Sequence, residues 1–260
     1  MFADTAVLVE RNLITVRRIP TLLLSATVQP LMFVFLFAYV FGATLGGGPY
    51  REFLMAGIFA QTMLFNSAFT TVGLAGDMSG GIVGRLRSLP MSRLAVITGR
   101  VCSDMVLGVV GLAVMVGCGL IIGWRVRGDP VDAAAAFGLL LLFAFAMAWV
   151  GAVMGLAARN VEVAQSIGFL WMFPVTFLSS AFISAASLPG PLRPIAEWNP
   201  VTAVATACRA RFGNAAPDDF PVPTGWPAEH AFGYALTWCV AITLVCVPLS
   251  MLLYRRSTRR

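Results

Sequence analysis

The hydrophobic and polar positions of this chain form long apolar runs separated by short charged stretches. Each run is long enough to cross a hydrocarbon core of ~30 Å as a helix that rises ~1.5 Å per residue. The six predicted spans cover residues 21–43, 53–76, 97–122, 134–158, 163–186 and 230–254. The pattern predicts an all-α, polytopic membrane protein with one transmembrane domain over residues 1–260. The first run is too long for a cleaved leader, so we expect it to remain as a membrane anchor.

Residues 3–19 predict a different kind of helix, with one charged face and one apolar face. The charged positions are Asp4, Glu10, Arg11, Arg17 and Arg18, and the apolar positions are Ala6, Val9, Leu13 and Val16. Such a helix carries too many charges to span a bilayer and is typical of one that lies in the interface. We expect it to end where Pro20 turns the chain into the membrane.

The loop predicted at residues 77–96 is basic and amphipathic. Arg85, Arg87, Arg93 and Arg100 fall close together, whereas the flanking stretches 53–76 and 105–122 contain no charge. Pro90 divides the loop, and Ser92 is a suitable N-cap for the helix that follows. Two interpretations remain open at this point. The loop either fixes the membrane topology, as most short basic loops do, or it forms a docking surface.

The arginines are distributed unevenly between the two sides that six spans would create. Twelve fall in the N-terminal segment, the second and fourth loops and the C-terminal tail, and six fall in the opposite loops. Because positive loops face the cytosol, we expect both termini there. The proline-rich segment 187–229, which holds eight of the fifteen prolines, is then external, and its pattern predicts short helices between spans five and six.

Composition narrows the possible functions. Hydrophobic residues make up 58% of the chain and charged residues 12%. All 18 basic residues are arginine, and without lysine the chain has neither a P-loop nor a Schiff-base site. The net charge of +6 follows the loops and lacks the interleaved aromatics of a nucleic-acid surface. We therefore expect no nucleic-acid partner, and no metal or cofactor in this chain.

Charged side chains are scarce within the predicted spans. Asp104 lies one turn into span three, four residues after Arg100, so the two can neutralise each other near the cytosolic edge. No other carboxylate is placed in a span. Transporters that are coupled to protons or sodium generally use buried carboxylates near the midplane. The pattern therefore argues against ion coupling.

Uncharged polar residues combine with aromatic ones on two predicted helix faces. The face on span two carries Thr62, Asn66, Phe69 and Thr70, and the face on span five carries Phe169, Phe173, Thr176, Phe177 and Ser180. Such residues commonly join helices by hydrogen bonds and packing, and that interpretation stays open. The second interpretation is a pocket for a flat amphipathic molecule, because aromatic planes and hydroxyls lie on the same side of each helix.

Two motifs resemble one family of membrane proteins. The run from Asp77 to Arg93, which contains Arg-Ser-Leu-Pro-Met-Ser-Arg, resembles the cytosolic loop between spans two and three of bacterial type-2 ABC exporter permeases, and the daunorubicin-resistance permeases are most similar. The turn Asn199-Pro200-Val201-Thr202 is also similar to that family. This chain departs from the family at Gly80, Gly81 and Gly84, where many members carry acidic residues. The surface of the protein that binds this loop is therefore expected to differ as well.

The resemblance implies roles for both cytosolic elements. The loop would be a coupling helix that docks on a separate nucleotide-binding subunit, and the N-terminal helix would contact the same subunit beside it. The residues implied in this contact are Arg85, Leu86, Arg87, Ser88, Leu89, Pro90, Met91, Ser92, Arg93, Glu10, Arg11 and Arg17.

The resemblance also implies an activity and its partners. The chain would be a permease in a bacterial cell membrane that exports an amphipathic drug, antibiotic or lipid along spans two and five. It would act with a second permease, identical or related, and with ATPase chains that bind ATP and Mg. The alternative is an integral membrane enzyme or a non-transporting scaffold. The single histidine, His230, offers little support for catalysis.

Overall fold

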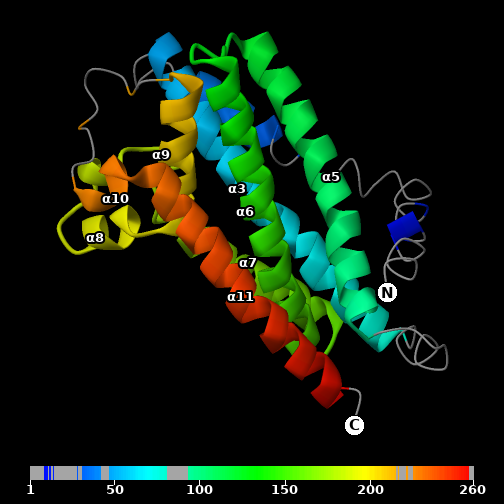
Figure 1. The fold of residues 1–260 in the computed structure, drawn as a ribbon. Helices are drawn as coiled ribbons and strands as arrows, with labels where there is room; N and C mark the ends of the chain where they lie inside the picture. The colour runs from blue at the N-terminus through cyan, green and yellow to red at the C-terminus, as the bar shows by residue number, and fades with distance from the viewer. Residues whose placement is uncertain are drawn as a thin grey trace.

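The computed structural model describes a helical bundle (Figure 1). The described residues are Val9, Glu10, Asn12, Ile14 and Val28, residues 31–41, 47–80 and 93–214, Ala216, Pro221 and residues 225–257. All regular secondary structure in this part of the chain is helical, which confirms the all-α prediction. Four of its helices, namely α3, α5, α6 and α11, are long and apolar enough to cross a membrane.

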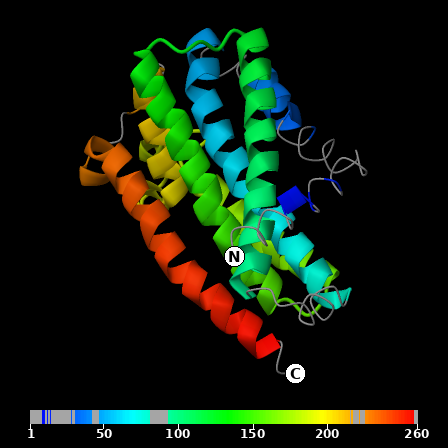
Figure 2. The same cartoon turned by 45° about the vertical axis from the view of Figure 1, so that its right-hand side comes forward.

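The helix α3 (Gly47–Ser79) forms the centre of the bundle and packs against α5 (Arg93–Ile122), α6 (Pro130–Ala157), α7 (Val161–Phe177) and α9 (Pro200–Phe212). Side chains from 53 to 67 are all buried, which is unusual for a span that faces lipid on one side. The helices α3 and α6 lie between α5 on one side and α9 with α11 (Ala231–Ser257) on the other (Figures 1 and 2). A helix that is apolar on most of its faces is typically buried, which agrees with the central position of α3.

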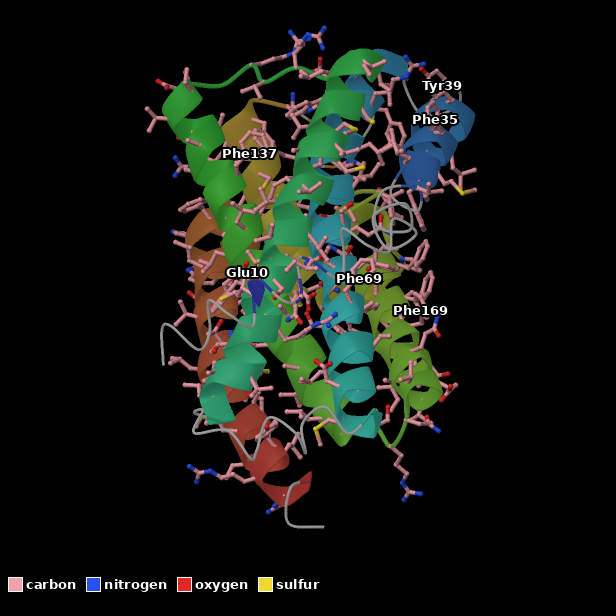
Figure 3. The ribbon with its side chains drawn as sticks, turned by 90° about the vertical axis from the view of Figure 1, so that its right-hand side faces the viewer. Glu10, Phe35, Tyr39, Phe69, Phe137 and Phe169 are labelled. Atoms are coloured by element: carbon pink, nitrogen blue, oxygen red, sulfur yellow. The ribbon has the colours of Figure 1, made fainter. Side chains whose placement is uncertain are left out.

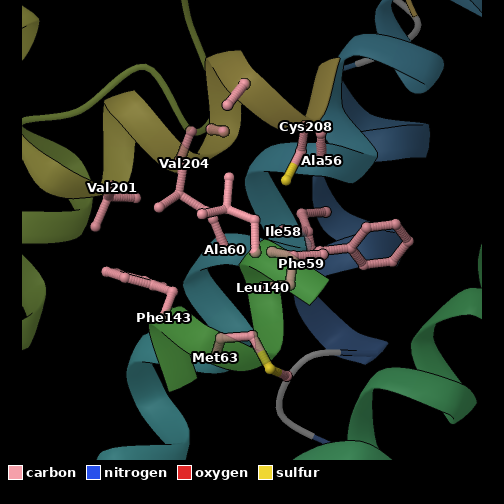
Figure 4. Packing of buried hydrophobic residues seen from close by; sticks show 14 of the residues in the cluster. Ala56, Ile58, Phe59, Ala60, Met63, Leu140, Phe143, Val201, Val204 and Cys208 are labelled. Atoms are coloured by element: carbon pink, nitrogen blue, oxygen red, sulfur yellow. The ribbon is translucent and has the colours of Figure 1, made fainter. Parts of the chain in front are cut away.

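Small residues allow α6 to approach α3 closely. A Cβ atom on Gly151 would lie 2.4 Å from the main-chain oxygen of Ser67, and one on Gly155 would lie 2.5 Å from that of Thr71. Helices in membranes associate through such small-residue contacts because lipid tails provide no hydrophobic drive between them. The same interface continues into an apolar cluster, whose labelled members come from three helices (Figure 4). Its labelled members are Ala56, Ile58, Phe59, Ala60 and Met63 of α3, Leu140 and Phe143 of α6, and Val201, Val204 and Cys208 of α9.

The helix α11 has the opposite character, since much of its apolar surface is uncovered. Leu244 and Val245 are 69% and 62% exposed, although both are aliphatic. In water this would be a costly surface, whereas in a bilayer the lipid tails cover it. The last turn carries Arg255 and Arg256, which suit the boundary with water.

The helix α7 is shorter than predicted. The expected span was 163–186, but the helix begins at Val161 after the N-cap Asn160 and ends at Phe177. Its interior contains Pro174, which cannot donate a main-chain hydrogen bond. Irregular chain follows from Leu178 to Ser184, then the 3₁₀ turn η2 (Ala185–Ser187). Hydropathy alone could not place this end, because residues 178–186 carry no charge and include several apolar side chains.

Helices occur in the segment 187–229, as predicted. They are α8 (Leu192–Glu197), α9 and α10 (Trp226–Glu229), and α9 begins with Asn199 as its N-cap and Pro200 in its first turn. The longest of them, α9, lies within the bundle. The helix α9 packs against α3, α6 and α11, and most of its side chains are buried. It therefore forms part of the core.

Several expected elements lie wholly or partly outside the described residues. Of the interfacial helix 3–19, only Val9, Glu10, Asn12 and Ile14 are described. The first span is described at Val28 and from 31 to 41, where an α-helical turn leads into the π-helix η1 (Leu36–Phe41). The loop 77–96 is described at 77–80 and from Arg93 onward.

Candidate functional site

The predicted coupling segment joins two helices at one end of the bundle. The end of α3, the start of α5 and the end of α11 lie together there (Figure 2). Arg93 is the first residue of α5. The other predicted docking residues of the loop, from Arg85 to Ser92, lie outside the described part of the chain, as do Arg11 and Arg17. Glu10 is helical and exposed.

The described part of the N-terminal segment contacts α5. Nδ2 of Asn12 donates a hydrogen bond to Oγ of Ser103 at 3.0 Å, and Asn12 is buried. Glu10 is drawn beside the same helix (Figure 3). Ser103 directly precedes Asp104, so the segment approaches the charged pair on α5.

The charged pair predicted within span three is confirmed. Nε of Arg100 lies 3.0 Å from Oδ2 of Asp104, which is 1% exposed. Arg100 also donates from Nη2 to the main-chain oxygen of Phe69 at 3.1 Å, which joins α5 to α3. The guanidinium packs against Gly73, where any side chain would collide with it. The pair thus fixes two spans while it neutralises its own charge.

A cavity of about 270 Å³ lies between α3, α5 and α7. Four residues of the predicted faces line it: Thr62, Asn66 and Phe69 from α3, and Phe169 from α7. Figure 3 shows Phe69 and Phe169 on these neighbouring helices. Two glutamines that the face argument left out, Gln61 and Gln165, also line it. The volume suits one small ring system, because it is just below the ~300–1,000 Å³ that ligand sites occupy.

Two further residues of the predicted faces, Phe173 and Phe177, extend an aromatic surface beside the cavity. Phe173 and Phe177 stack with ring centroids 6.0 Å apart, and Phe169 lies 5.9 Å from Phe173. Phe65, which lines the cavity, meets Phe173 edge to face. Since Phe173 and Phe177 are 39% and 48% exposed, these rings lead from the cavity to the surface of the bundle.

The remaining three residues of those faces do not line the cavity. Thr70 and Thr176 are fully buried. Ser180 lies beyond the end of α7, so the expectation that it shares a helix face with Phe169 is wrong. Its main-chain nitrogen donates to Oγ1 of Thr202 on α9 at 2.9 Å. The early helix end explains the difference, because a face at helical spacing exists only while the helix continues.

A buried arginine holds this irregular segment, and the sequence argument missed it. Arg209 of α9 is 7% exposed and lies over the ring of Phe53 at 3.5 Å. It donates hydrogen bonds to the main-chain oxygens of Phe53 (2.9 Å), Ser180 (2.7 Å) and Ala181 (2.9 Å). No carboxylate within the described residues forms an ion pair with it, so carbonyl groups and a π face solvate the charge.

A second side chain of α9 supports the same break. Asn199 donates from Nδ2 to the main-chain oxygens of Val175 and Leu178, both at 2.8 Å. These two carbonyl groups belong to the end of α7, where intrahelical partners are lost. Non-helical backbone at membrane depth is tolerated where protein satisfies its polar groups. The helix α9 therefore makes the early end of α7 possible.

Comparisons with known proteins identify the family of this chain. The ABC-2 type transporter family matches residues 4–212. The daunorubicin resistance ABC transporter permease protein DrrB1 of Streptomyces coeruleorubidus is 28% identical over 249 residues, which cover 94% of this chain and 83% of that protein. The probable doxorubicin resistance ABC transporter permease protein DrrC of Mycobacterium tuberculosis is 23% identical over 241 residues, which cover 90% and 82%. Because the family match extends over most of the chain, this protein belongs to the ABC-2 type transporter family.

Proposed function

We propose that this chain is the permease subunit of an ATP-driven exporter that moves an amphipathic or hydrophobic molecule out of the cell. The family match over residues 4–212 carries the proposal. Two relatives are named as daunorubicin and doxorubicin resistance permeases, which makes a drug or antibiotic the first cargo to test, with a lipid as the second.

Energy for transport comes from a separate chain in this proposal. The sequence contains no lysine, so it lacks the residue with which a P-loop reaches the terminal phosphates of ATP. The carboxylate of Asp104 is paired with Arg100, which leaves it unsuited to carry protons or sodium. A nucleotide-binding subunit with bound ATP and Mg would supply the driving force.

The proposed topology has six spans with both termini in the cytosol of a bacterial cell. The end of α3, the start of α5 and the end of α11 lie at one end of the bundle, which supports this topology. The two ends of the predicted cytosolic loop and the C-terminal arginines are therefore on the same side. The short α7 and the partly described first span would complete the six. A second permease, identical or related, would pair with this one.

The proposed mechanism runs from the docking surface to the spans. Closure of the ATPase chains would push on the segment 79–93 and on the N-terminal helix. Asn12, which bonds to Ser103 beside the Arg100–Asp104 pair, gives that push a rigid contact with α5. Arg100 is bonded in turn to the main chain of α3 at Phe69, whose ring lines the cavity. The spans would then tilt and open a path to the outside.

The proposed path for cargo includes both predicted faces. Thr62, Asn66, Phe69 and Phe169 line the cavity, and Phe173 and Phe177 continue the aromatic surface. Thr70, Thr176 and Ser180 were proposed with them from the sequence and would have to become accessible on opening.

Co-expression with a candidate nucleotide-binding ATPase tests this function. A tagged permease should copurify that ATPase, and cells should extrude a fluorescent amphipathic dye more slowly when the P-loop lysine of the ATPase is replaced. If dye efflux is the same with an intact and a mutated P-loop, ATP does not drive this permease. If no ATPase copurifies, the chain is a scaffold or acts alone.

A further inference from the structure

Two indoles and one aliphatic side chain are exposed near the start of α11, where α8 and α10 lie. Ile195 of α8, Trp198 at the C-terminal cap of α8 and Trp226 of α10 are 54%, 54% and 56% exposed. Ile195 and Trp198 are three residues apart, so they share one face of this turn, whereas Ala196 is buried. We call these three exposed residues the indole patch. An apolar patch of this kind usually marks a surface that another molecule covers.

Tyr234 of α11 joins the two indoles into one unit. Its ring lies edge to face with both, at centroid distances of 5.7 Å from Trp198 and 5.7 Å from Trp226. Its hydroxyl donates to the main-chain oxygen of Trp198 at 2.9 Å. Trp198 directly precedes Asn199, the N-cap of α9, and α9 belongs to the core. The indole patch is therefore held at a fixed height relative to the bundle.

The length of α11 places the indole patch at a membrane boundary. Arg255 and Arg256 in the last turn of α11 suit one boundary with water. From Ala231 to Arg255 an α-helix rises about 36 Å at ~1.5 Å per residue. A bilayer is ~40–45 Å thick with its headgroup regions, and any tilt of the helix reduces the thickness that it crosses. The start of α11 therefore falls in the headgroup region of the opposite leaflet or deeper, and not in bulk water.

The indole patch also continues the lipid-facing surface of α11. Exposed positions recur along this helix every three or four residues, at Gly233, Thr237, Val240 and Leu244. Toward the start of the helix, the same spacing leads to His230 and Trp226, whose rings stack at 5.3 Å. Figure 1 shows α10 directly ahead of α11 on the outside of the bundle. Lipid that covers the exposed side of α11 can therefore extend to Trp226.

The side chains of the indole patch suit the level of the headgroups. An indole combines a large apolar ring with one N–H donor, and tryptophan is enriched at membrane boundaries for this reason. The charges of the two short helices do not favour anionic lipids. Arg193 pairs with Glu197 at 2.7 Å, and α10 adds the exposed Glu229. A surplus of positive charge would be needed for attraction to anionic headgroups, and α8 and α10 do not have one.

We propose that Ile195, Trp198 and Trp226 insert into the leaflet opposite the C-terminal arginines, at the boundary between its headgroups and its acyl chains, and that zwitterionic lipid is sufficient for this contact. The short helices α8 and α10 then rest in the membrane surface and do not project into water. The proposal requires only that the chain spans a bilayer, so its test is independent of ATP-driven export.

A nitroxide label at Ile195→Cys tests the depth of the indole patch. The full-length permease, without its five native cysteines, would be placed in phosphatidylcholine nanodiscs. Electron paramagnetic resonance then measures how often the label collides with oxygen, which concentrates among acyl chains, and with a water-soluble nickel chelate. Labels at Leu244→Cys, on the lipid-facing side of α11, and at Arg125→Cys, in the exposed loop between α5 and α6, give the two limits. The ratio of oxygen to nickel collisions at Ile195 should lie between them, several-fold above the ratio at Arg125.

Three results would overturn the proposal. Nickel collisions at Ile195 as frequent as those at Arg125 would place the indole patch in water. Few collisions with either reagent would show that protein, such as a second permease, covers it. A ratio that exceeds the Arg125 limit only after phosphatidylglycerol is added would show that zwitterionic lipid is not sufficient.

Native fluorescence tests the indoles themselves. Phosphatidylcholine that is brominated near the headgroup end of its acyl chains should quench both exposed tryptophans. Trp198→Phe with Trp226→Phe should lower this quenching by about half, because the two indoles at the headgroup level are then lost. Trp124→Phe is the matched control, because Trp124 is 1% exposed and donates to Oδ1 of Asn214 at 2.8 Å, and it should leave the quenching unchanged. Equal quenching before and after the double substitution would contradict the insertion of these two side chains.

Discussion

At the scale of single residues, the sequence placed side chains correctly where their partners are close in the chain. Arg100 and Asp104 are four residues apart on one helix, and their ion pair follows from that spacing. Arg209 was assigned to the external side because it falls in the segment 187–229 between the predicted spans five and six. Its acceptors lie 156 and 29 residues away, at Phe53 and Ser180, and only the folded chain brings them to it.

The first prediction concerns Arg209. Arg209→Leu should lower the stability of the permease by about 2–4 kcal/mol, because it leaves several buried carbonyl groups without donors. The measurement is the midpoint of thermal unfolding in detergent, followed by size-exclusion chromatography. Arg209→Lys should recover little of the loss, since one ammonium cannot reproduce the spread of the guanidinium.

Arg193→Leu provides the comparison for Arg209→Leu. Arg193 pairs with Glu197 on the surface of α8, and its side chain is 42% exposed. A pair of this kind contributes about 0–1 kcal/mol, so the midpoint should hardly move. Equal shifts for Arg193→Leu and Arg209→Leu would show that the buried guanidinium has no special role in the fold.

The candidate cavity was predictable in part. Helical spacing brought Thr62, Asn66 and Phe69 onto one side of α3, and these residues do line the cavity. Gln61 was missed because it is adjacent to Thr62 in sequence and about 100° away round the helix. The surface supplied by α5 was missed for another reason. Its lining residue Gly111 has no side chain, so it leaves no signal in a search for polar or aromatic groups.

At the scale of elements, hydropathy located the long helices but not their ends. The runs that became α3, α5, α6 and α11 are long and apolar enough to form spans despite a few polar residues. The break after Phe177 depends on Asn199 and Arg209 of α9, which satisfy the main chain there. The hydropathy of one segment carries no information about the hydrogen bonds that a distant segment donates to it in the folded chain.

The second prediction tests the close contact between α3 and α6. Gly151→Ala should lower stability by about 1–3 kcal/mol, because its Cβ would overlap the main-chain oxygen of Ser67 and force the helices apart. Gly138→Ala, on the same helix with nothing within 4 Å of its Cβ, should be neutral or stabilise by up to about 1 kcal/mol. The measurement is the midpoint of thermal unfolding of the two variants. An unchanged midpoint for Gly151→Ala would contradict the close contact between α3 and α6.

At the scale of the whole molecule, the orientation of the protein in the membrane is predicted from the uneven distribution of its arginines. The third prediction is that a cysteine at Ser88 resists an impermeant maleimide in intact cells, whereas one at Asp218 reacts. The test needs a background without the five native cysteines, since Cys102 is exposed. Labelling at Ser88 but not at Asp218 would invert the proposed topology.

The last prediction concerns coupling between the ATPase and the bundle. Arg85→Glu with Arg87→Glu should leave the yield of folded permease unchanged, because the described apolar core includes neither residue. Copurification of the ATPase and dye efflux should fall together by at least about tenfold, since two attractive charges at a docking surface become repulsive. Arg255→Glu with Arg256→Glu changes the net charge by the same amount at the exposed end of α11 and controls for effects on membrane orientation. If efflux and copurification are normal in both the loop variant and the control, the segment 79–93 is not part of the coupling route. The N-terminal contact between Asn12 and Ser103 would then be the connection to test.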